Sequence, residues 1–433
     1  MQIPQTGLSH EDVMAKLEEN RGNDADWRHA KTWSLVYSAG EDIERVVKEA
    51  YLKYFSENAL NPNAFPSLRQ FEGDVISMAV TMLHGEEDSV GSMTTGGSES
   101  LLMAVKTARE WARENMPHVT EPEMLAPLSV HAAIEKASHY FGVKVVHIPL
   151  DAGFRADVAA ARELVTPNTI LIIGSAPAYP QGVMDPIEDL AALAQEKGIL
   201  CHVDACLGGF LLPWVEKLGY PIRPFDFRVP GVTSISADIH KYGYAAKGAS
   251  VILYRTRDLR RHQFFVYPDW PGGLYASPTM TGTRPGGAIA AAWAALNYIG
   301  EAGYMRLAKV VMDTTKSLQA GIRAIPELKI LGEPDMSVTA FTSDDIDIYM
   351  LGDRMEERGW KLDRQQLPPC LHMMVTPPHA AIIEPFLSDL RECAASLQGT
   401  DATPEGAAAM YGMLNSLPDR DAVKDFLRDF MET

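Results

Sequence analysis

The chain has 433 residues, and 39 Lys and Arg against 57 Asp and Glu give it a formal net charge of −18. This acidic balance argues against a protein that binds nucleic acid through a broad basic surface. Hydrophobic residues make up 46% and charged residues 22%, which is the composition of a globular protein that folds without disulfides. Of the four cysteines, Cys201 and Cys206 lie in an apolar stretch, which favours small buried side chains over a zinc site.

The N-terminal residues contain no basic stretch followed by an apolar one, so we expect no signal peptide. The longest apolar stretch, around 288–300, is shorter than the roughly 20 residues that a transmembrane helix needs. We therefore expect a soluble, cytoplasmic protein without a transmembrane segment. Residues 1–60 are mainly polar with helical spacing, and we expect them to form an arm or a cap outside the core.

The middle of the chain alternates short apolar runs with helical stretches, which predicts an α/β fold with a mostly parallel sheet. Strands are expected at 91–95, 143–148, 169–174, 199–203, 234–237 and 249–254, and helices from 97, at 131–140 and at 186–198. Asp185 is the expected N-cap of the last of these helices, with Glu188 completing a capping box and Gly198 ending the helix. Ligands of such sheets bind beyond the carboxyl ends of the strands.

The pattern changes after a long apolar helix that begins near Gly286. Short strands at 328–331, 337–342 and 372–375, with helices at 346–358 and 380–397, predict a smaller α+β unit. The sequence therefore predicts an N-terminal helical arm at 1–60, a large α/β domain at 61–309 and a C-terminal α+β domain at 310–433.

Polar residues follow several of the predicted strands. Thr94–Ser100 is a Gly-Gly loop that opens a helix, and its backbone amides can bind a phosphate, although such a turn is commonly just the start of a helix. Asp204 follows another strand, and it is either a helix cap or the partner of a protonated heteroaromatic nitrogen. His131, at the start of a predicted helix, is ordinarily a cap or a core residue, and only its position near the other features makes it a candidate.

Lys241 lies in an aromatic, glycine-rich stretch directly after a predicted strand. A lysine that is removed from water has a lowered pKa and can form a Schiff base with a carbonyl, so Lys241 is the candidate nucleophile and Lys247 its competitor. Pyridoxal 5′-phosphate (PLP) requires a lysine for its aldehyde, an acid beside its pyridine nitrogen, an anion site and a flat partner for its ring. The four features together therefore predict a PLP site.

Two stretches, HVDACLGGF (His202–Phe210) and DIHKYGYAAKG (Asp238–Gly248), resemble the sphingosine-1-phosphate lyase family, which belongs to the group II decarboxylase-like PLP enzymes. The similarity includes GSAPAYPQGVMDP at 174–186 and QFFVYPDWPGGLYASPTMTGTRPGG at 263–287, and it covers roughly residues 30–390. It implies fold type I, the aspartate-aminotransferase-like fold of PLP-dependent transferases, with a large, mostly parallel seven-stranded sheet and a small C-terminal α+β domain.

The resemblance also implies a role for each matching residue. Lys241 would carry the cofactor, Asp204 would pair with the pyridine nitrogen, and His131 would stack on the ring. The remaining cofactor-binding residues would hold the phosphate: Gly97, Ser98, His240 and, from the neighbouring subunit, Thr283, which implies a homodimer with shared active sites. Tyr37 matches an active-site tyrosine of the family, and Tyr179 matches an aromatic position beside the cofactor. Tyr37 or Tyr179 is our candidate for the proton transfers.

Lys247, Asn61 and Tyr37 would contact the phosphate of the substrate. Asn61 stands where many members of the family have histidine, and Ala246 replaces a proline. Asn61 can donate a neutral hydrogen bond but carries no charge, so this position departs from the family pattern. The membrane-spanning N-terminal segment of the eukaryotic members has no counterpart in the sequence, which favours a bacterial-type form.

The implied reaction is the retro-aldol cleavage of a phosphorylated long-chain base, such as sphingosine 1-phosphate or sphinganine 1-phosphate, to a long-chain aldehyde and ethanolamine phosphate. One alternative is a PLP-dependent amino-acid decarboxylase of the same group, which needs a cation for the α-carboxylate and no long apolar channel. A second alternative is a catalytically weak PLP-fold protein that binds a partner or a lipid. The complete set of Lys241, Asp204 and His131 argues against it.

Overall fold

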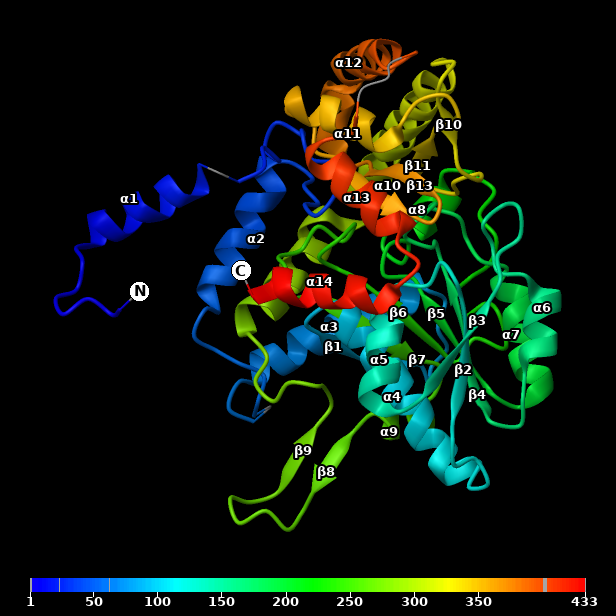
Figure 1. The fold of residues 1–433 in the computed structure, drawn as a ribbon. Helices are drawn as coiled ribbons and strands as arrows, with labels where there is room; N and C mark the ends of the chain where they lie inside the picture. Colours follow the sequence, from blue (N-terminus) through cyan, green and yellow to red (C-terminus); the bar gives the residue numbers. More distant parts are fainter. Residues whose placement is uncertain (1, 23, 62, 400–402, 433) are drawn as a thin grey trace.

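A seven-stranded sheet lies at the centre of the computed structural model, which describes residues 2–22, 24–61, 63–399 and 403–432 (Figure 1). The strand order is β1-β7-β6-β5-β4-β2-β3. The pairs among β2 to β6 are parallel, and only β7 runs against its neighbours β1 and β6. The strands are β1 (Val90–Thr94), β2 (Glu123–Pro127), β3 (Lys144–Ile148), β4 (Thr169–Ser175), β5 (Leu200–Asp204), β6 (Ser234–Ala237) and β7 (Ser250–Tyr254). The predicted mostly parallel sheet is confirmed.

Helices cover both faces of this sheet. The side chains of β4 reach two separate cores, with Ile172 in one and Ile173 in the other. Every residue of β4, β5 and β7 is buried, as expected of strands that are covered on both faces. The connecting helices are α4 (Gly97–Asn115), α5 (Ala133–Phe141), α6 (Val158–Leu164), α7 (Ile187–Lys197), α8 (Leu212–Lys217) and α9 (Arg257–Arg261).

The predicted start of α7 is wrong. The N-cap is Pro186 and no side chain caps the helix, so the capping box with Glu188 is absent. The buried carboxylate of Asp185 instead accepts hydrogen bonds from the backbone N–H groups of Ser175 (2.8 Å) and Ala156 (2.9 Å). Burial raises the pKa of Asp185 to about 6, although both backbone donors favour the charged form. The predicted end at Gly198 is confirmed, because this residue has a φ of +67°.

The N-terminal segment divides into two parts with different packing. Helix α1 (His10–Arg21) has no buried residue and extends away from the body (Figure 1). By contrast, Trp33 is fully buried, and its ring stacks on His379 with centroids 4.2 Å apart. Helix α2 (Glu41–Lys53) adds Ile43 and Val47 to the main core. The expectation of an arm outside the core is therefore wrong from Trp33 onward, because this segment packs against the C-terminal part of the chain.

Helix α10 (Gly286–Arg323) runs from the large sheet to the C-terminal part and is interrupted at Gly300, where φ is +59°. A four-stranded antiparallel sheet follows, with the order β10-β11-β13-β12. Its strands are β10 (Lys329–Ile330), β11 (Val338–Thr342), β12 (Asp363–Gln366) and β13 (Pro369–Met374), and its helices are α11 (Ile348–Glu357), the 3-10 helix η1 (Pro377–Ala381) and α12 (Ile383–Ser396). The domain boundaries at 60/61 and 309/310 stay a prediction, and α10 crosses the second of them.

The remaining elements lie at the edges of the molecule. A hairpin of β8 (Phe265–Tyr267) and β9 (Tyr275–Ser277) projects from the body (Figure 1). The other helices are α3 (Pro66–Met82), α13 (Gly406–Ser416) and α14 (Arg420–Glu432). Within the described residues, no helix combines the length and the apolar character that crossing a membrane requires.

Candidate active site

A cavity of about 390 Å³ lies at the carboxyl ends of β4, β5 and β6. This is the edge at which a parallel sheet is expected to bind its ligand. Seven of the predicted site residues line the cavity: Gly97, Ser98, His131, Tyr179, Asp204, His240 and Lys241. Four others, Tyr37, Lys247, Asn61 and Thr283, lie outside its lining.

Lys241 follows β6 in a tight turn, and its Nζ lies 2.9 Å from Oδ2 of Asp238. Burial disfavours the charged ammonium, but the charge of Asp238 outweighs burial and raises the pKa of Lys241 above its ordinary value. The expectation of a lowered pKa for this lysine is therefore wrong, because the sequence analysis overlooked the carboxylate three residues earlier.

Asp238 is thus a functional residue that the sequence analysis missed. Its side chain is only 2% exposed, and its Oδ2 also lies 3.7 Å from Nε2 of His240. Burial opposes ionisation of Asp238, but the charge of Lys241 more than compensates and lowers the pKa of the carboxyl. The spacing in Asp-Ile-His-Lys was the available signal, because residues three apart in a turn can pair.

Asp204 ends β5 and is 7% exposed. Its Oδ1 accepts a hydrogen bond from the backbone N–H of Cys206 at 3.0 Å and lies 3.5 Å from Oγ of Ser236. No helix begins at this turn, since α8 starts at Leu212, so Asp204 is not a helix cap. A buried carboxylate at the cavity wall suits the role of partner for a protonated ring nitrogen.

The first turn of α4 can hold a phosphate. The N-cap is Gly96 without any side-chain hydrogen bond, so the backbone N–H groups of the first turn remain available for an anion. A Cβ atom at Gly97 would lie 2.8 Å from both Oδ2 of Asp238 and Sγ of Cys206, so only glycine allows this close approach. Nδ1 of His240 accepts from the N–H of Ala249 at 3.3 Å, and burial lowers the pKa of His240.

Glu99 is a second residue that the sequence analysis missed at this loop. Its Oε2 accepts hydrogen bonds from the N–H and the hydroxyl of Thr95 at 2.7 and 2.6 Å, and its Oε1 accepts from the N–H of Met280 at 2.8 Å. This carboxylate therefore joins the phosphate loop to the loop that contains Thr283.

His131 combines two roles. Its Nδ1 accepts a hydrogen bond from the N–H of Ala133, the first residue of α5, at 3.1 Å, although the N-cap of this helix is Ala132. The same side chain lines the cavity and is exposed, so the ring can stack on a flat ligand. The structural and the functional interpretation of this histidine are compatible.

Tyr37 and Lys247 form a pair beside the cavity. Nζ of Lys247 lies 4.9 Å from the centroid of the Tyr37 ring and 3.5 Å from the carbonyl oxygen of His240. Lys247 is exposed, but the protein around its stem partly removes the ammonium from water, and this effect, followed by repulsion from Lys241, lowers the pKa of Lys247 to about 8. The Tyr37 hydroxyl lies 3.0 Å from Sδ of Met374, and burial followed by the charge of Asp238 raises the pKa of Tyr37.

Asn61 and Thr283 are both exposed. Their segments lie side by side, because Asn58 forms an antiparallel bridge with Pro285 and the N–H of Ala59 donates to the carbonyl of Arg284 at 3.0 Å. The structure therefore brings these two predicted residues near one another but does not include either in the lining of the cavity of their own chain.

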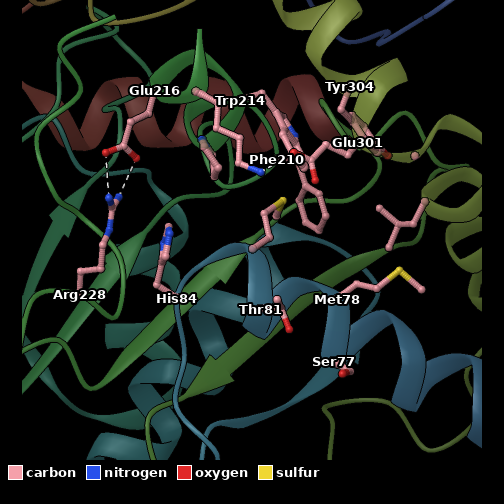
Figure 2. A pocket seen from close by; sticks show the side chains of 15 residues that line it. Ser77, Met78, Thr81, His84, Phe210, Trp214, Glu216, Arg228, Glu301 and Tyr304 are labelled. Carbon is pink, nitrogen blue, oxygen red and sulfur yellow. Dashed lines mark hydrogen bonds and ion pairs between the residues drawn. The ribbon is translucent and has the colours of Figure 1, made fainter. Parts of the chain in front are cut away.

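A larger cavity, of about 610 Å³, lies between α3, α8 and α10 (Figure 2). None of the predicted site residues lines it. Its charged side chains are paired, with the guanidinium of Arg228 2.8 Å from both carboxylate oxygens of Glu216 and Lys217 2.7 Å from Glu301. The cofactor chemistry therefore belongs to the smaller cavity, whose lysine, aspartate, histidine and helix N-terminus match the needs of PLP.

Comparisons with known proteins identify the family of this chain. The family described as "Pyridoxal-dependent decarboxylase conserved domain" matches residues 2–343. The sphingosine-1-phosphate lyase of Oryza sativa subsp. japonica is 43% identical over 100% of this chain and 81% of its own length. The chain belongs to the sphingosine-1-phosphate lyase family. The corresponding protein of Rattus norvegicus is 42% identical over 100% of this chain and 76% of its own length.

Solved structures extend the comparison to the fold. The sphingosine-1-phosphate lyase of Burkholderia pseudomallei is 42% identical, covers 93% of both chains and has a TM-score of 0.89. The glutamate decarboxylase of Lactobacillus brevis has a TM-score of 0.82 at 18% identity over 93% of this chain and 96% of its own, which is a likeness of fold alone. The predicted fold type I architecture and the predicted PLP cofactor are confirmed, and this member of the lyase family is a PLP-dependent enzyme.

Proposed function

We propose that this chain cleaves a phosphorylated long-chain base into a long-chain aldehyde and ethanolamine phosphate. The observation that carries the proposal is Lys247, a cation beside the cavity that forms no ion pair with a carboxylate of the described residues. A phosphate is an anion that needs such a cation, and a charge-assisted hydrogen bond contributes about 1.5–3 kcal/mol. The names of the relatives, sphingosine-1-phosphate lyases, support the same substrate class.

The residues that line the cavity are proposed to hold PLP. Lys241 would hold the aldehyde group of the cofactor, Asp204 would pair with the pyridine nitrogen, and His131 would stack on the ring. The phosphate contacts come from the amides of Gly97 and Ser98 and from His240, together with Thr283 of a second copy. When bound, PLP supplies the ring that accepts the electron pair left on C2 when the C2–C3 bond of the substrate breaks.

The chain must also move two protons. One leaves the C3 hydroxyl of the substrate as the aldehyde forms, and one reaches C2 before ethanolamine phosphate is released. We assign these transfers to Tyr37 and Tyr179, whose pKa values are both raised, first by burial and then by nearby carboxylates. Each phenol therefore keeps its proton at neutral pH. Tyr37 is able to donate its proton toward C2, whereas the oxygen of Tyr179 is able to accept the C3 proton as its own proton passes to Asp363 along their hydrogen bond of 2.9 Å. Tyr37 and Asn61 add neutral hydrogen bonds to the substrate phosphate beside Lys247.

We also propose a homodimer with shared active sites. The hairpin β8–β9 exposes large apolar side chains, with Leu274 88%, Val266 64% and Phe265 57% exposed. Exposed apolar surface of this kind on a projecting element favours a protein partner. Thr283 and Asn61 are exposed next to this hairpin's connection to α10, so a second copy that covers the hairpin can receive both residues at its own cavity.

A cytoplasmic location is proposed as well. All four cysteines, Cys201, Cys206, Cys370 and Cys393, are free, which suits a reducing compartment. Fractionation of the native host, followed by detection of the chain, tests this location.

A comparison of three substrates on the PLP-loaded protein tests the proposed function. We expect turnover of a phosphorylated sphingoid base, and a KM roughly tenfold to a hundredfold higher for the unphosphorylated base, because the latter lacks the charge-assisted contact with Lys247. Release of carbon dioxide from glutamate, with no preference for the phosphorylated base, would favour the decarboxylase alternative. A protein that acquires no visible cofactor absorbance would instead support the non-catalytic alternative.

A further inference from the structure

Tyr179 is held at the cavity wall by a residue from the C-terminal sheet. Its hydroxyl donates a hydrogen bond to Oδ2 of Asp363 at 2.9 Å, across 184 residues of sequence. Asp363 begins β12, whereas Tyr179 follows β4 of the large sheet. The contact therefore links the two sheets at the edge of the active site.

His372 holds the same tyrosine from the other side. The ring centroids of Tyr179 and His372 are 4.3 Å apart, and Nε2 of His372 lies 2.9 Å from the carbonyl oxygen of Tyr179. Because a carbonyl only accepts, Nε2 carries a proton and donates it. The other ring nitrogen, Nδ1, lies 3.7 Å from Oδ2 of Asp363. The ring and the backbone of Tyr179 are therefore fixed by His372, and its hydroxyl by Asp363.

The carboxylate of Asp363 is itself fixed in place. Its Oδ1 accepts a hydrogen bond from the hydroxyl of Ser34 at 2.9 Å, which brings the N-terminal segment to the same point. Burial opposes the charge of Asp363, but His372, Tyr179 and Ser34 outweigh burial and lower the pKa of the carboxyl. An ionised carboxylate only accepts hydrogen bonds, so the proton of the Tyr179 hydroxyl points toward Asp363.

We propose that Asp363 is a positioning residue that acts through Tyr179. It fixes the direction of the phenolic O–H, so that the phenol oxygen presents its lone pairs, and not its proton, to a donor in the cavity. A substrate hydroxyl is such a donor, and for the retro-aldol reaction it must be oriented before it loses its proton. The inference rests on the proposed function for the identity of that hydroxyl, but the Tyr179–Asp363 contact itself is independent of the substrate.

A double-mutant cycle with PLP-loaded protein tests this role. For Asp363→Ala we expect kcat to fall about tenfold to a hundredfold with little change in KM, since loss of orientation at a reacting group has effects of this size. Tyr179→Phe should lower kcat to a similar extent, and the double variant should be no slower than Tyr179→Phe alone. Asp363→Asn should keep most of the activity, because its amide oxygen still accepts the hydrogen bond from Tyr179.

Asp347→Asn is the matched control. Asp347 is a carboxylate of the same C-terminal part, which caps α11 through the N–H groups of Tyr349 and Met350 and makes no contact with Tyr179. This variant should keep the wild-type kcat. A wild-type kcat in Asp363→Ala, multiplicative losses in the double variant, or an Asp363→Asn variant as slow as Asp363→Ala would each overturn the proposal.

Titration of Tyr179 in the protein without substrate tests the contact independently of any change in turnover. The pKa of Tyr179 is raised by burial and then by the charge of Asp363, so Tyr179 should ionise at lower pH in Asp363→Asn than in the wild type. The signal of this one tyrosine is the ultraviolet difference between each protein and its Tyr179→Phe counterpart. This titration also applies if Asp363→Ala fails to fold, and an unchanged ionisation of Tyr179 would overturn the contact. Failure of the proposed function would instead appear as absence of aldehyde from the wild type.

Discussion

Nζ of Lys241 lies 2.9 Å from Oδ2 of Asp238, a carboxylate that is only 2% exposed. The lysine that is proposed to bind the cofactor is therefore held as an ammonium ion, although the reaction with an aldehyde needs the neutral amine. The charge of Asp238 stabilises the protonated form against the effect of burial and raises the pKa of Lys241. Formation of the Schiff base then requires Lys241 to lose a proton that Asp238 helps to retain.

Asp238→Asn should let the protein without cofactor take up PLP at lower pH. Removing the negative charge lowers the pKa of Lys241, and an opposite charge at this range shifts a pKa by about one to three units. The measurement is the pH dependence of the visible absorbance that develops after PLP is added. Asp335→Asn is the control, because Asp335 pairs with Arg155 at 3.1 Å and does not line the cavity. This variant should keep the wild-type profile. An unchanged profile for Asp238→Asn would refute the assigned electrostatic role.

Lys247 should make substrate binding depend on pH near 8. Its pKa is lowered to about 8, so the ammonium that we propose to contact the substrate phosphate is present below that pH and is lost as the pH rises through it. We expect KM for the phosphorylated base to increase above pH 8, whereas an ordinary lysine stays charged to about pH 10. Lys247→Arg keeps its charge throughout and should give a KM that does not rise in this range. Parallel KM profiles for the wild type and Lys247→Arg would contradict the assignment.

Lys247→Ala measures how much the proposed contact between Lys247 and the substrate phosphate contributes to substrate binding. Its KM for the phosphorylated base should be roughly tenfold to a hundredfold above the wild-type value, as expected for the loss of a charge-assisted hydrogen bond. The affinity for PLP, measured by visible absorbance, should change far less. Equal losses in PLP affinity and KM would place Lys247 at the cofactor instead of the substrate.

Asp204→Asn should bind PLP and lose most of its activity. Without the carboxylate, the pyridine nitrogen is not held protonated, and removal of a single preorganised electrostatic partner typically costs about 10²–10³-fold in kcat. Steady-state kinetics on protein with normal cofactor content provide the measurement. Turnover close to the wild-type rate would mean that Asp204 only stabilises the turn, through its hydrogen bond with the N–H of Cys206.

Complementation between two inactive variants tests the shared active site. Thr283→Ala should weaken PLP binding, and Lys241→Ala should remove the cofactor absorbance. In a mixed dimer, one cavity would combine an intact Lys241 with an intact Thr283 from the other copy. We therefore expect the mixture to exceed the mean activity of the two parents once subunit exchange is confirmed. Activity equal to that mean would contradict a site built from two copies.

The large sheet could be predicted from the sequence more accurately than the packing of the N-terminal segment and the C-terminal sheet. Strands such as β4 are continuous apolar runs, and glycines such as Gly198 mark helix ends, so both are visible locally. The role of Asp185 was not visible, because its partner Ser175 ends β4 and its partner Ala156 lies 29 residues earlier in the chain. Burial of Trp33 was missed for the same reason, and β12 (Asp-Arg-Gln-Gln) has no apolar alternation to reveal it.

Parts of the candidate site could likewise be predicted from the sequence, whereas others required the structure. Residues at strand ends, including Asp204 and Lys241, could be assigned to the cavity because the order of the strands brings those ends together. The pKa of Lys241 could not be assigned correctly without Asp238, whose side chain turns toward the same cavity. The link from Tyr179 to Asp363 spans two sheets and requires coordinates.

Analysis of the products tests the central claim most directly. PLP-loaded protein is incubated with a phosphorylated sphingoid base, and the long-chain aldehyde and ethanolamine phosphate are quantified together, with Lys241→Ala as the control. The account predicts equal amounts of both products from the wild type and neither from Lys241→Ala, with no carbon dioxide released from glutamate by the same preparation. Carbon dioxide from glutamate without any aldehyde from the phosphorylated base would contradict it.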